Sequence, residues 1–271
     1  MRRIITCIFF VFNLLTVRSQ TQPLSIGEIR TMHSAVLNEE RTLNIYLPSD
    51  YDSTQTYPVL YLLDGSMDED FIHIVGLTQF FNMMYTMPSC IVVGIANVDR
   101  KRDFTFHTDI PSLKETYPTT GKSAAFIRFL EEELQPFVQK NYRTNDTKYL
   151  IGQSLGGLLA TEILLKKPSL FTHYFIVSPS LWWDDESLLR QAPALLAQQP
   201  DQTRFVYVSA GKKEPKVMQR EAKSLHGTLQ KSGKKNLKTV YKPMTSDNHA
   251  TVLHNSIYAG FMALFPPRYD E

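Results

Sequence analysis

The ten residues Tyr149-Leu-Ile-Gly-Gln-Ser-Leu-Gly-Gly-Leu158 decide the expected fold. The apolar residues 149–151 predict a short buried strand, and the small-residue-rich run from Leu155 to Lys166 predicts a helix. Between them, Gly152-Gln-Ser-Leu-Gly156 matches G-x-S-x-G, which in this context is typical of a tight strand-to-helix turn that exposes a serine hydroxyl above a sheet. The pattern therefore predicts Ser154 as a nucleophile. The alternative is a glycine-rich helix start in which Ser154 is only an N-cap.

Strands and helices alternate on both sides of this turn. Continuous apolar runs at 59–64, 90–96, 175–178 and 205–209 are typical of strands buried on both faces, whereas residues 41–48 alternate as in an outer antiparallel strand. Apolar residues at helical spacing mark 123–142, and further helices are expected at 215–231 and 254–264. This order predicts an α/β protein with a mostly parallel central sheet covered by helices on both faces. No linker divides the chain, so residues 22–271 are expected to form one domain.

The first 20 residues have the composition of a leader. Arg2 and Arg3 precede an apolar run from Ile4 to Val17, a layout typical of a secretory signal peptide. Residues 1–20 are therefore predicted to be removed, leaving an exported protein, periplasmic or extracellular, without stable membrane insertion. The alternatives are a buried first strand or an uncleaved anchor. Loss of the leader would leave Cys90 as the lone cysteine and exclude an intrachain disulfide.

Charge and spacing exclude several function classes. The 29 Lys and Arg residues nearly balance the 27 Asp and Glu residues, and the leader contributes three of the arginines. No later basic cluster carries interleaved aromatics, so nucleic-acid binding is not expected. No His, Cys or Asp group has metal-ligand spacing, so neither a metal nor another cofactor is expected.

A serine nucleophile needs a base, which in many enzymes is supported by an acid. His249 follows the last predicted strand, residues 239–242, in a polar loop that could return over Ser154, so it is the candidate base. His173, His226 and His254 are expected to have structural or surface roles. Glu214, just beyond the strand 205–209, is the candidate acid. The open alternatives are Asp184, Asp185, Asp247 or no acid at all.

Two further sets of residues are candidates for the site. The backbone N–H groups of Leu155, at the helix start, and of Gly65 or Ser66, after the strand 59–64, are candidate oxyanion donors. The candidate substrate contacts lie in loops beside the expected cleft and are Arg100, Arg102, Trp182 and Trp183. Arginines suit an anionic ligand, and tryptophans suit a ring or a sugar. The alternative is structural: Arg102 pairs with Asp103 or Asp64, and the tryptophans pack in the core.

With these residues in place, the chain resembles the Putative esterase family of α/β-hydrolases, including its exported, siderophore-esterase-like branch. That family includes esterase D, the enterochelin and salmochelin esterases, and feruloyl esterase modules. The resemblance covers about residues 38–265 and rests on RTLNIYLPSDYD, YPVLYLLDG, GIANVDRKRDFT, FLEEELQPFVQKNYRT, YLIGQSLGGLLA, SPSLWWDD, and SAGKKE ahead of NHATV. Two residues depart from the family pattern: Gln153 replaces a frequent histidine, and Phe106 replaces a frequent proline.

The resemblance implies an α/β-hydrolase fold and a secreted serine esterase that forms an acyl-enzyme on Ser154 with His249 as base. Glu214 falls where many relatives carry an acid, although some siderophore esterases work with a Ser–His pair. The expected substrate is a small-molecule ester, such as a siderophore, feruloyl or sugar ester. The alternatives are an acyltransferase using the same serine and a catalytically inactive binding protein. The intact Ser154, His249 and glycine turn argue against the last.

Overall fold

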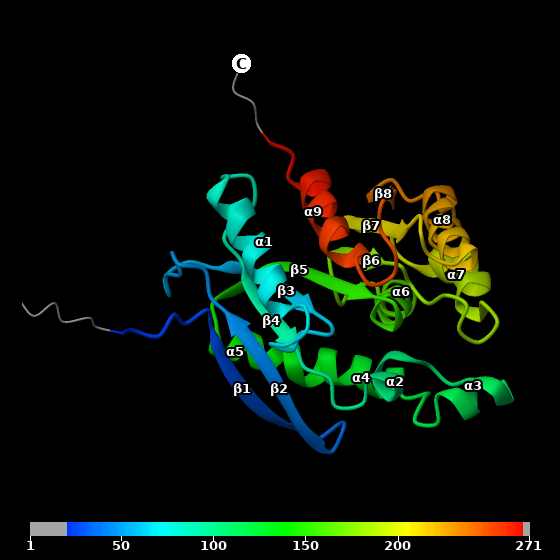
Figure 1. Ribbon diagram of the computed structural model, residues 1–271, viewed down its shortest axis with the longest axis horizontal. Coiled ribbons are helices and arrows are strands. Elements are labelled where there is room, and N and C mark those ends of the chain that lie inside the picture. Colours follow the sequence, from blue (N-terminus) through cyan, green and yellow to red (C-terminus); the bar gives the residue numbers. More distant parts are fainter. Residues whose placement is uncertain (1–20, 268–271) are drawn as a thin grey trace, which may run out of the picture.

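The computed structural model describes residues 21–267, so the predicted signal peptide lies outside the described residues. Eight strands form one sheet in the order β1-β2-β4-β3-β5-β6-β7-β8 (Figure 1). Strand β2 is antiparallel to both of its neighbours, and all other pairs are parallel. The strands are β1 (Glu28–Ser34), β2 (Glu39–Tyr46), β3 (Tyr57–Leu62), β4 (Ile91–Ile95), β5 (Thr144–Gln153), β6 (His173–Val177), β7 (Arg204–Gly211) and β8 (Leu237–Met244).

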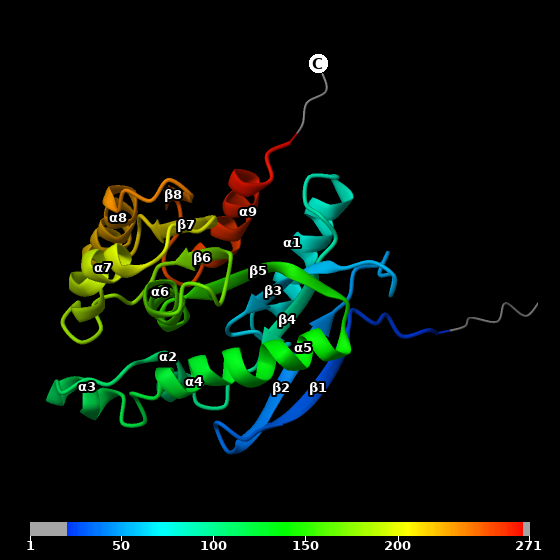
Figure 2. The ribbon, with the colours of Figure 1, turned by 180° about the vertical axis from the view of Figure 1, so that it is seen from behind.

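Helices cover both faces of the sheet (Figures 1 and 2). The first face is covered by α1 (Phe71–Met83) and α9 (Val252–Leu264), whose buried side chains join one hydrophobic cluster. The second face is covered by α4 (Ser123–Phe129), η1 (Leu130–Leu134), α5 (Gln135–Asn141), α6 (Leu155–Lys166), α7 (Ser187–Gln198) and α8 (Lys216–Lys231). The short helices α2 (Arg100–Phe104) and α3 (Pro111–Thr116) lie in the segment after β4. The predicted fold class, a mostly parallel sheet between helical layers, is confirmed.

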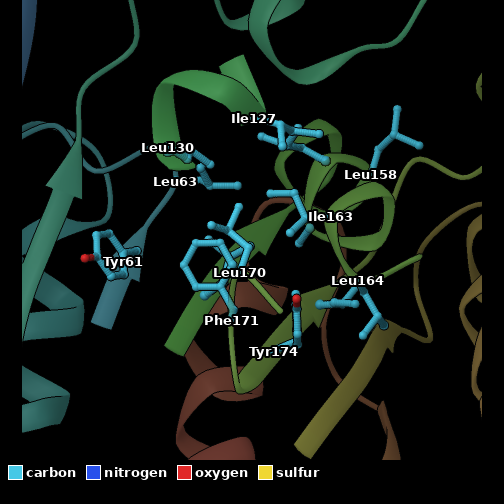
Figure 3. Close-up of a cluster of buried hydrophobic side chains, with 14 of the residues drawn as sticks. Tyr61, Leu63, Ile127, Leu130, Leu158, Ile163, Leu164, Leu170, Phe171 and Tyr174 are labelled. Carbon is cyan, nitrogen blue, oxygen red and sulfur yellow. The ribbon is translucent and has the colours of Figure 1, made fainter. Parts of the chain in front are cut away.

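Side chains alternate between the two hydrophobic clusters along the central strand β3. Leu60 and Leu62 join the cluster under α1 and α9, whereas Val59 and Tyr61 join the opposite cluster. Figure 3 shows part of the second cluster, where Ile163 and Leu164 of α6 lie near Phe171 and Tyr174. Every residue of α6 from Leu155 to Leu165 is buried. The helix that follows the predicted nucleophile is therefore held rigidly in the core.

Several elements differ from the sequence-based expectation. Strand β1 was not expected, because its two apolar residues, Ile29 and Met32, do not alternate with period two, and five of its seven residues are exposed. As a result, the segment expected as an outer strand lies one position inside the edge, as β2. Helices α1 and α7 were not expected either, and the supposedly irregular residues 97–122 contain α2 and α3. The helix expected over 123–142 is interrupted by the π-helical turn η1. Within residues 21–267, no helix has both the length and the apolarity to cross a bilayer.

Candidate active site

The turn between β5 and α6 holds Ser154 in an unusual backbone conformation. Its φ is 59° and its ψ is −118°, outside the regions that most residues adopt. The Ser154 N–H donates to the Val177 carbonyl of the neighbouring strand β6 at 3.1 Å. Strained backbone conformations are held in place by the surrounding structure, and they occur most often at active sites. The geometry is that of the sharp strand-to-helix turn expected for the predicted nucleophile.

Glycine is required at Gly152 because the chain passes so close to itself. A Cβ atom there would lie 2.4 Å from the Gly156 carbonyl oxygen, closer than van der Waals contact permits. At Gly157 a Cβ would lie 2.9 Å from the Pro179 Cα, so the segment after β6 packs directly on the first turn of α6. Both glycines therefore fix where Ser154 stands relative to β6.

We expect Gly152→Ala to lower the free energy of unfolding by about 3 kcal/mol and to reduce esterase activity, because backbone atoms must move to admit the methyl group. Thermal or urea denaturation together with an ester assay measures both effects. The control is Gly76→Ala in α1, where a Cβ would have nothing within 4 Å. That substitution should stabilise the protein by about 0.5–1 kcal/mol, because alanine favours a helix over glycine. Equal stability of the two variants would contradict the close-contact argument.

His249 lies in the loop between β8 and α9, beside the turn that holds Ser154. Its carbonyl oxygen accepts a hydrogen bond from Gln153 Nε2 at 2.6 Å, which fixes the loop to the residue before Ser154. Its ring nitrogen Nδ1 lies 3.3 Å from Glu214 Oε1. This distance is long for a hydrogen bond, but catalytic hydrogen bonds are often long in the absence of substrate.

Glu214 follows β7, and its side chain is fully buried. The same oxygen that faces His249, Oε1, accepts a hydrogen bond from Ser178 Oγ at 2.7 Å. Within the described residues, Glu214 Oε2 is buried without a hydrogen-bond partner. A carboxylate in this setting is shielded from water, which strengthens its electrostatic effect on an imidazole beside it.

The three alternative acids lie in other hydrogen-bond networks. Asp247 Oδ1 accepts from Thr251 Oγ1 at 3.0 Å and from Asn255 Nδ2 at 2.8 Å. The carboxylate of Asp184 accepts from hydroxyl groups before α3 and at the start of α7, and Asp185 pairs with a surface arginine. Among these four acids, Glu214 is the one hydrogen-bonded to His249.

Ser154 and His249 share one cleft of about 400 Å³. It is lined by Asp64, Glu69, Asp70, Arg100, Gln153, Ser154, His249 and Ala250. A larger hollow of about 600 Å³ lies along the end of β8 and α9, but its lining includes neither Ser154 nor His249. The smaller cleft is therefore where a substrate would meet both groups.

Acidic side chains dominate the cleft. Arg100 donates to both Asp64 carboxylate oxygens, at 2.6 and 2.9 Å, so these two charges offset each other. Glu69 and Asp70 remain as additional carboxylates. Burial, and next the neighbouring Asp64 carboxylate, raise the pKa of Asp70 to about 6. The sequence-based prediction did not include Glu69 and Asp70. Both belong to the acidic segment 68–70, which comes shortly after the candidate oxyanion donors that follow β3.

Both candidate oxyanion donors that follow β3 are already engaged in hydrogen bonds. The Gly65 N–H donates to the Ile95 carbonyl at 3.0 Å, and the Ser66 N–H lies 3.3 Å from a Glu69 carboxylate oxygen. By contrast, the Asp64 N–H has no hydrogen-bond partner within residues 21–267. Its side chain reaches α6, because Oδ2 lies 3.4 Å from where a Cβ of Gly156 would be. The Leu155 N–H is the first of α6, at the position expected for an oxyanion donor.

The candidate substrate contacts divide into two groups. Arg100 lines the cleft, and its Nη2 also donates to the Gln153 carbonyl at 3.2 Å. Arg102 instead forms ion pairs with Glu39 and Asp103 at 2.6 and 2.7 Å and does not line the cleft. This differs from the expected substrate contact and matches the structural alternative.

The two tryptophans also lie outside the cleft lining. Trp183 is fully buried, and its indole N–H donates to the Phe106 carbonyl at 3.0 Å, so it is a core residue rather than a substrate contact. Trp182 is half-buried and packs beside Tyr117, with ring centroids 6.2 Å apart. Both tryptophans belong to the segment between β6 and α7, and their indole rings anchor that segment to neighbouring residues.

Comparison with known proteins gives the family. Residues 34–266 match the model of the Putative esterase family. The chain is 30% identical over 250 residues to the ferri-bacillibactin esterase BesA of Bacillus subtilis, covering 83% of this chain and 85% of that protein. The crystal structure of the BES protein from Bacillus cereus matches with a TM-score of 0.79 and 28% identity, over 91% of this chain and 97% of that one. An IroE-like serine hydrolase from Shewanella oneidensis matches with a TM-score of 0.79 and 30% identity, over 88% and 80% of the two chains. The chain therefore belongs to the Putative esterase family and is a carboxylic ester hydrolase of the α/β-hydrolase fold.

Proposed function

We propose that this protein hydrolyses its ester through a covalent acyl-enzyme on Ser154, with His249 as general base and Glu214 as the supporting acid. The observation that carries the proposal is the shared cleft: Ser154 lies on a strained turn beside His249, whose Nδ1 faces the buried Glu214. A Ser–His–acid arrangement is recognised by such geometry rather than by position in the sequence.

The reaction proceeds in two steps. Ser154 Oγ attacks the ester carbonyl carbon while its proton passes to His249 Nε2, and that proton then goes to the departing alcohol. Water releases the acyl group in the second step, with His249 again taking and returning one proton. Glu214 holds the Nδ1–H of the imidazole and stabilises the positive charge that the ring carries in between.

Two backbone N–H groups are the proposed oxyanion donors. Leu155 N–H stands at the positive end of α6, where the helix dipole favours a negative charge. Asp64 N–H replaces Gly65 as the second donor, because the Gly65 N–H is already bonded to Ile95. The Asp64–Arg100 pair would hold that strand end against the nucleophile turn.

Siderophore esters are the proposed substrate class, because a relative covering most of this chain is named a ferri-bacillibactin esterase. Purified protein is to be incubated with siderophore, feruloyl, acetyl-sugar and short acyl esters, and the acid and alcohol products measured. Adding excess alcohol to a p-nitrophenyl acetate assay separates hydrolysis from acyl transfer. Formation of a new ester in place of acetate would favour the acyltransferase.

The acidic cleft predicts a dependence on substrate charge. Neutralising the carboxylates of Glu69 and Asp70 in the double variant Glu69→Gln/Asp70→Asn should raise the kcat/KM for an anionic ester about 5-fold relative to a neutral one. Each removed repulsion contributes about 0.5 kcal/mol at a solvated site. The hemisuccinate and butyrate esters of p-nitrophenol supply the anionic and the neutral substrate.

The same preference should depend on pH. Because the pKa of Asp70 is raised to about 6, lowering the pH from about 7.5 to about 5.5 protonates Asp70 and removes one negative charge. The hemisuccinate-to-butyrate ratio should therefore rise more steeply in the wild type than in the double variant as the pH falls; His254, 3.8 Å from Asp70, is present in both proteins. Using a ratio cancels the effects of pH on the catalytic steps that both substrates share. Parallel pH curves for the two proteins would contradict a charge effect of Asp70.

We also propose that the protein is exported, on the basis of the basic start and apolar run in residues 1–20. Protein recovered from its native host should begin near residues 20–22 and lie outside the cytoplasm. N-terminal sequencing of fractionated cells measures this, and cytoplasmic protein starting at Met1 would contradict it.

A further inference from the structure

The turn that follows β6 contacts two members of the proposed triad. Ser178, with a positive φ of 41°, donates its N–H to the Ser209 carbonyl at 2.8 Å and its hydroxyl to Glu214. Two residues later, the Ser180 N–H donates to the Ser154 carbonyl at 3.0 Å. Pro179 between them packs on α6 at Gly157. This turn is therefore fixed to the nucleophile by a backbone hydrogen bond and to the acid by the Ser178 side chain.

The Ser180 hydroxyl stands directly beside the nucleophile. Ser180 is 2% exposed, and its Oγ lies 3.3 Å from Ser154 Oγ. A buried hydroxyl usually has a hydrogen-bond partner, and here that partner is the reacting atom itself. The distance is longer than a normal O–H···O hydrogen bond, so a small movement on substrate binding would complete it.

We propose that Ser180 is a further catalytic residue, whose hydroxyl donates a hydrogen bond to Ser154 Oγ as that oxygen loses its proton. This inference rests on the proposed function of Ser154. Ser154 Oγ carries one proton, which passes to His249 Nε2 while the new bond to the carbonyl carbon forms. Ser180 keeps its own proton throughout and only shares it with the negative charge on Oγ.

The direction of the hydrogen bond follows from the reaction. If Ser154 donated to Ser180, its proton would point away from His249 and the nucleophile would stay inactive. With Ser180 as donor, the Ser154 proton is free for the base. The bond then strengthens as negative charge develops, because hydrogen bonds to charged acceptors are about twice as strong as neutral ones. The same donor acts again when the acyl-enzyme breaks down and Ser154 Oγ becomes the leaving group.

We expect Ser180→Ala to lower kcat about 10- to 100-fold and to leave KM within twofold, since the bond strengthens in the transition state. The rate constant for labelling of Ser154 by a fluorophosphonate should fall by a similar factor, because that reaction needs the same activated oxygen but no ester substrate. Ser180→Cys keeps the shape of the side chain with a slightly larger atom and replaces the hydroxyl with a weak donor, so it should show a loss of the same kind even if the alanine variant folds poorly.

The matched control is Ser256→Ala. Ser256 belongs to another buried serine pair, in which Ser209 Oγ donates to Ser256 Oγ at 2.9 Å, and it does not line the cleft. This variant loses a similar buried hydrogen bond and should keep its labelling rate while its melting temperature falls. Labelling of folded Ser180→Ala or Ser180→Cys within twofold of the wild type would overturn the proposal, as would an equal loss in Ser256→Ala. Retained esterase activity in Ser154→Ala would instead refute the proposed function itself.

Discussion

Replacing Ser154 with alanine is expected to reduce ester hydrolysis by about a millionfold, the loss typical when a triad nucleophile is removed. The residual rate would come from the oxyanion donors and from substrate binding. The strained backbone at Ser154, with its φ of 59°, remains in the variant because the glycines and α6 fix it. The measurement is kcat/KM for a reactive p-nitrophenyl ester, together with labelling by a fluorophosphonate.

Folding and labelling supply the controls for this experiment. The melting temperature of Ser154→Ala should stay close to that of the wild type, since within residues 21–267 the lost hydroxyl hydrogen-bonds to Ser180 Oγ alone. Mass spectrometry of the wild type should place the phosphonyl group on Ser154, and the alanine variant should carry none. Labelling of another serine, or full hydrolysis by the variant, would refute the assignment of the nucleophile.

The sequence predicts most of the sheet because its buried strands are almost uninterrupted apolar runs. Strand β3, for example, is buried at all six positions and needs no partner information to be recognised. Strand β1 gives no such signal, because an edge strand with exposed side chains is held by its backbone pairing with β2. Helix α7 was missed although it is amphipathic, and it contains Pro193, a residue that usually argues against a helix interior.

The site was predictable to the extent that it is local. The turn around Ser154 is encoded by neighbouring residues, whereas the oxyanion donors depend on which N–H groups the sheet has already used. Glycine at position 65 lets the backbone approach β4 closely, and the same close approach lets the Gly65 N–H donate to the Ile95 carbonyl. Arg102 and Trp183 were ambiguous because their partners, Glu39 and the Phe106 carbonyl, are distant in the sequence. Sequence position alone does not distinguish an arginine in a cleft from one in an ion-pair network.

The pairing of His249 with Glu214 leads to the second large expected effect. Glu214→Gln should lower kcat about 10⁴-fold, the loss seen when the acid of a well-studied triad becomes an amide. The amide has no negative charge to stabilise the imidazolium. If its NH₂ group faces His249, Nδ1 must accept a hydrogen bond, and the ring then carries its proton on Nε2, where it cannot take one from Ser154. The measurement is kcat for the same p-nitrophenyl ester at a pH where the wild-type rate has reached its plateau.

Asp247→Asn is the matched control, because Asp247 is a buried carboxylate two residues from His249 whose Oδ1 bonds to Thr251 and Asn255. It should affect stability more than rate. If Glu214→Gln changed kcat by less than tenfold, the enzyme would work as a Ser–His pair, and Glu214 would have only a structural role through Ser178. The burial of Glu214 argues against that outcome: its Oε2 has no hydrogen-bond partner within residues 21–267. A carboxylate so poorly solvated is costly for the fold, and its retention beside His249 is explained if its charge acts on the imidazolium.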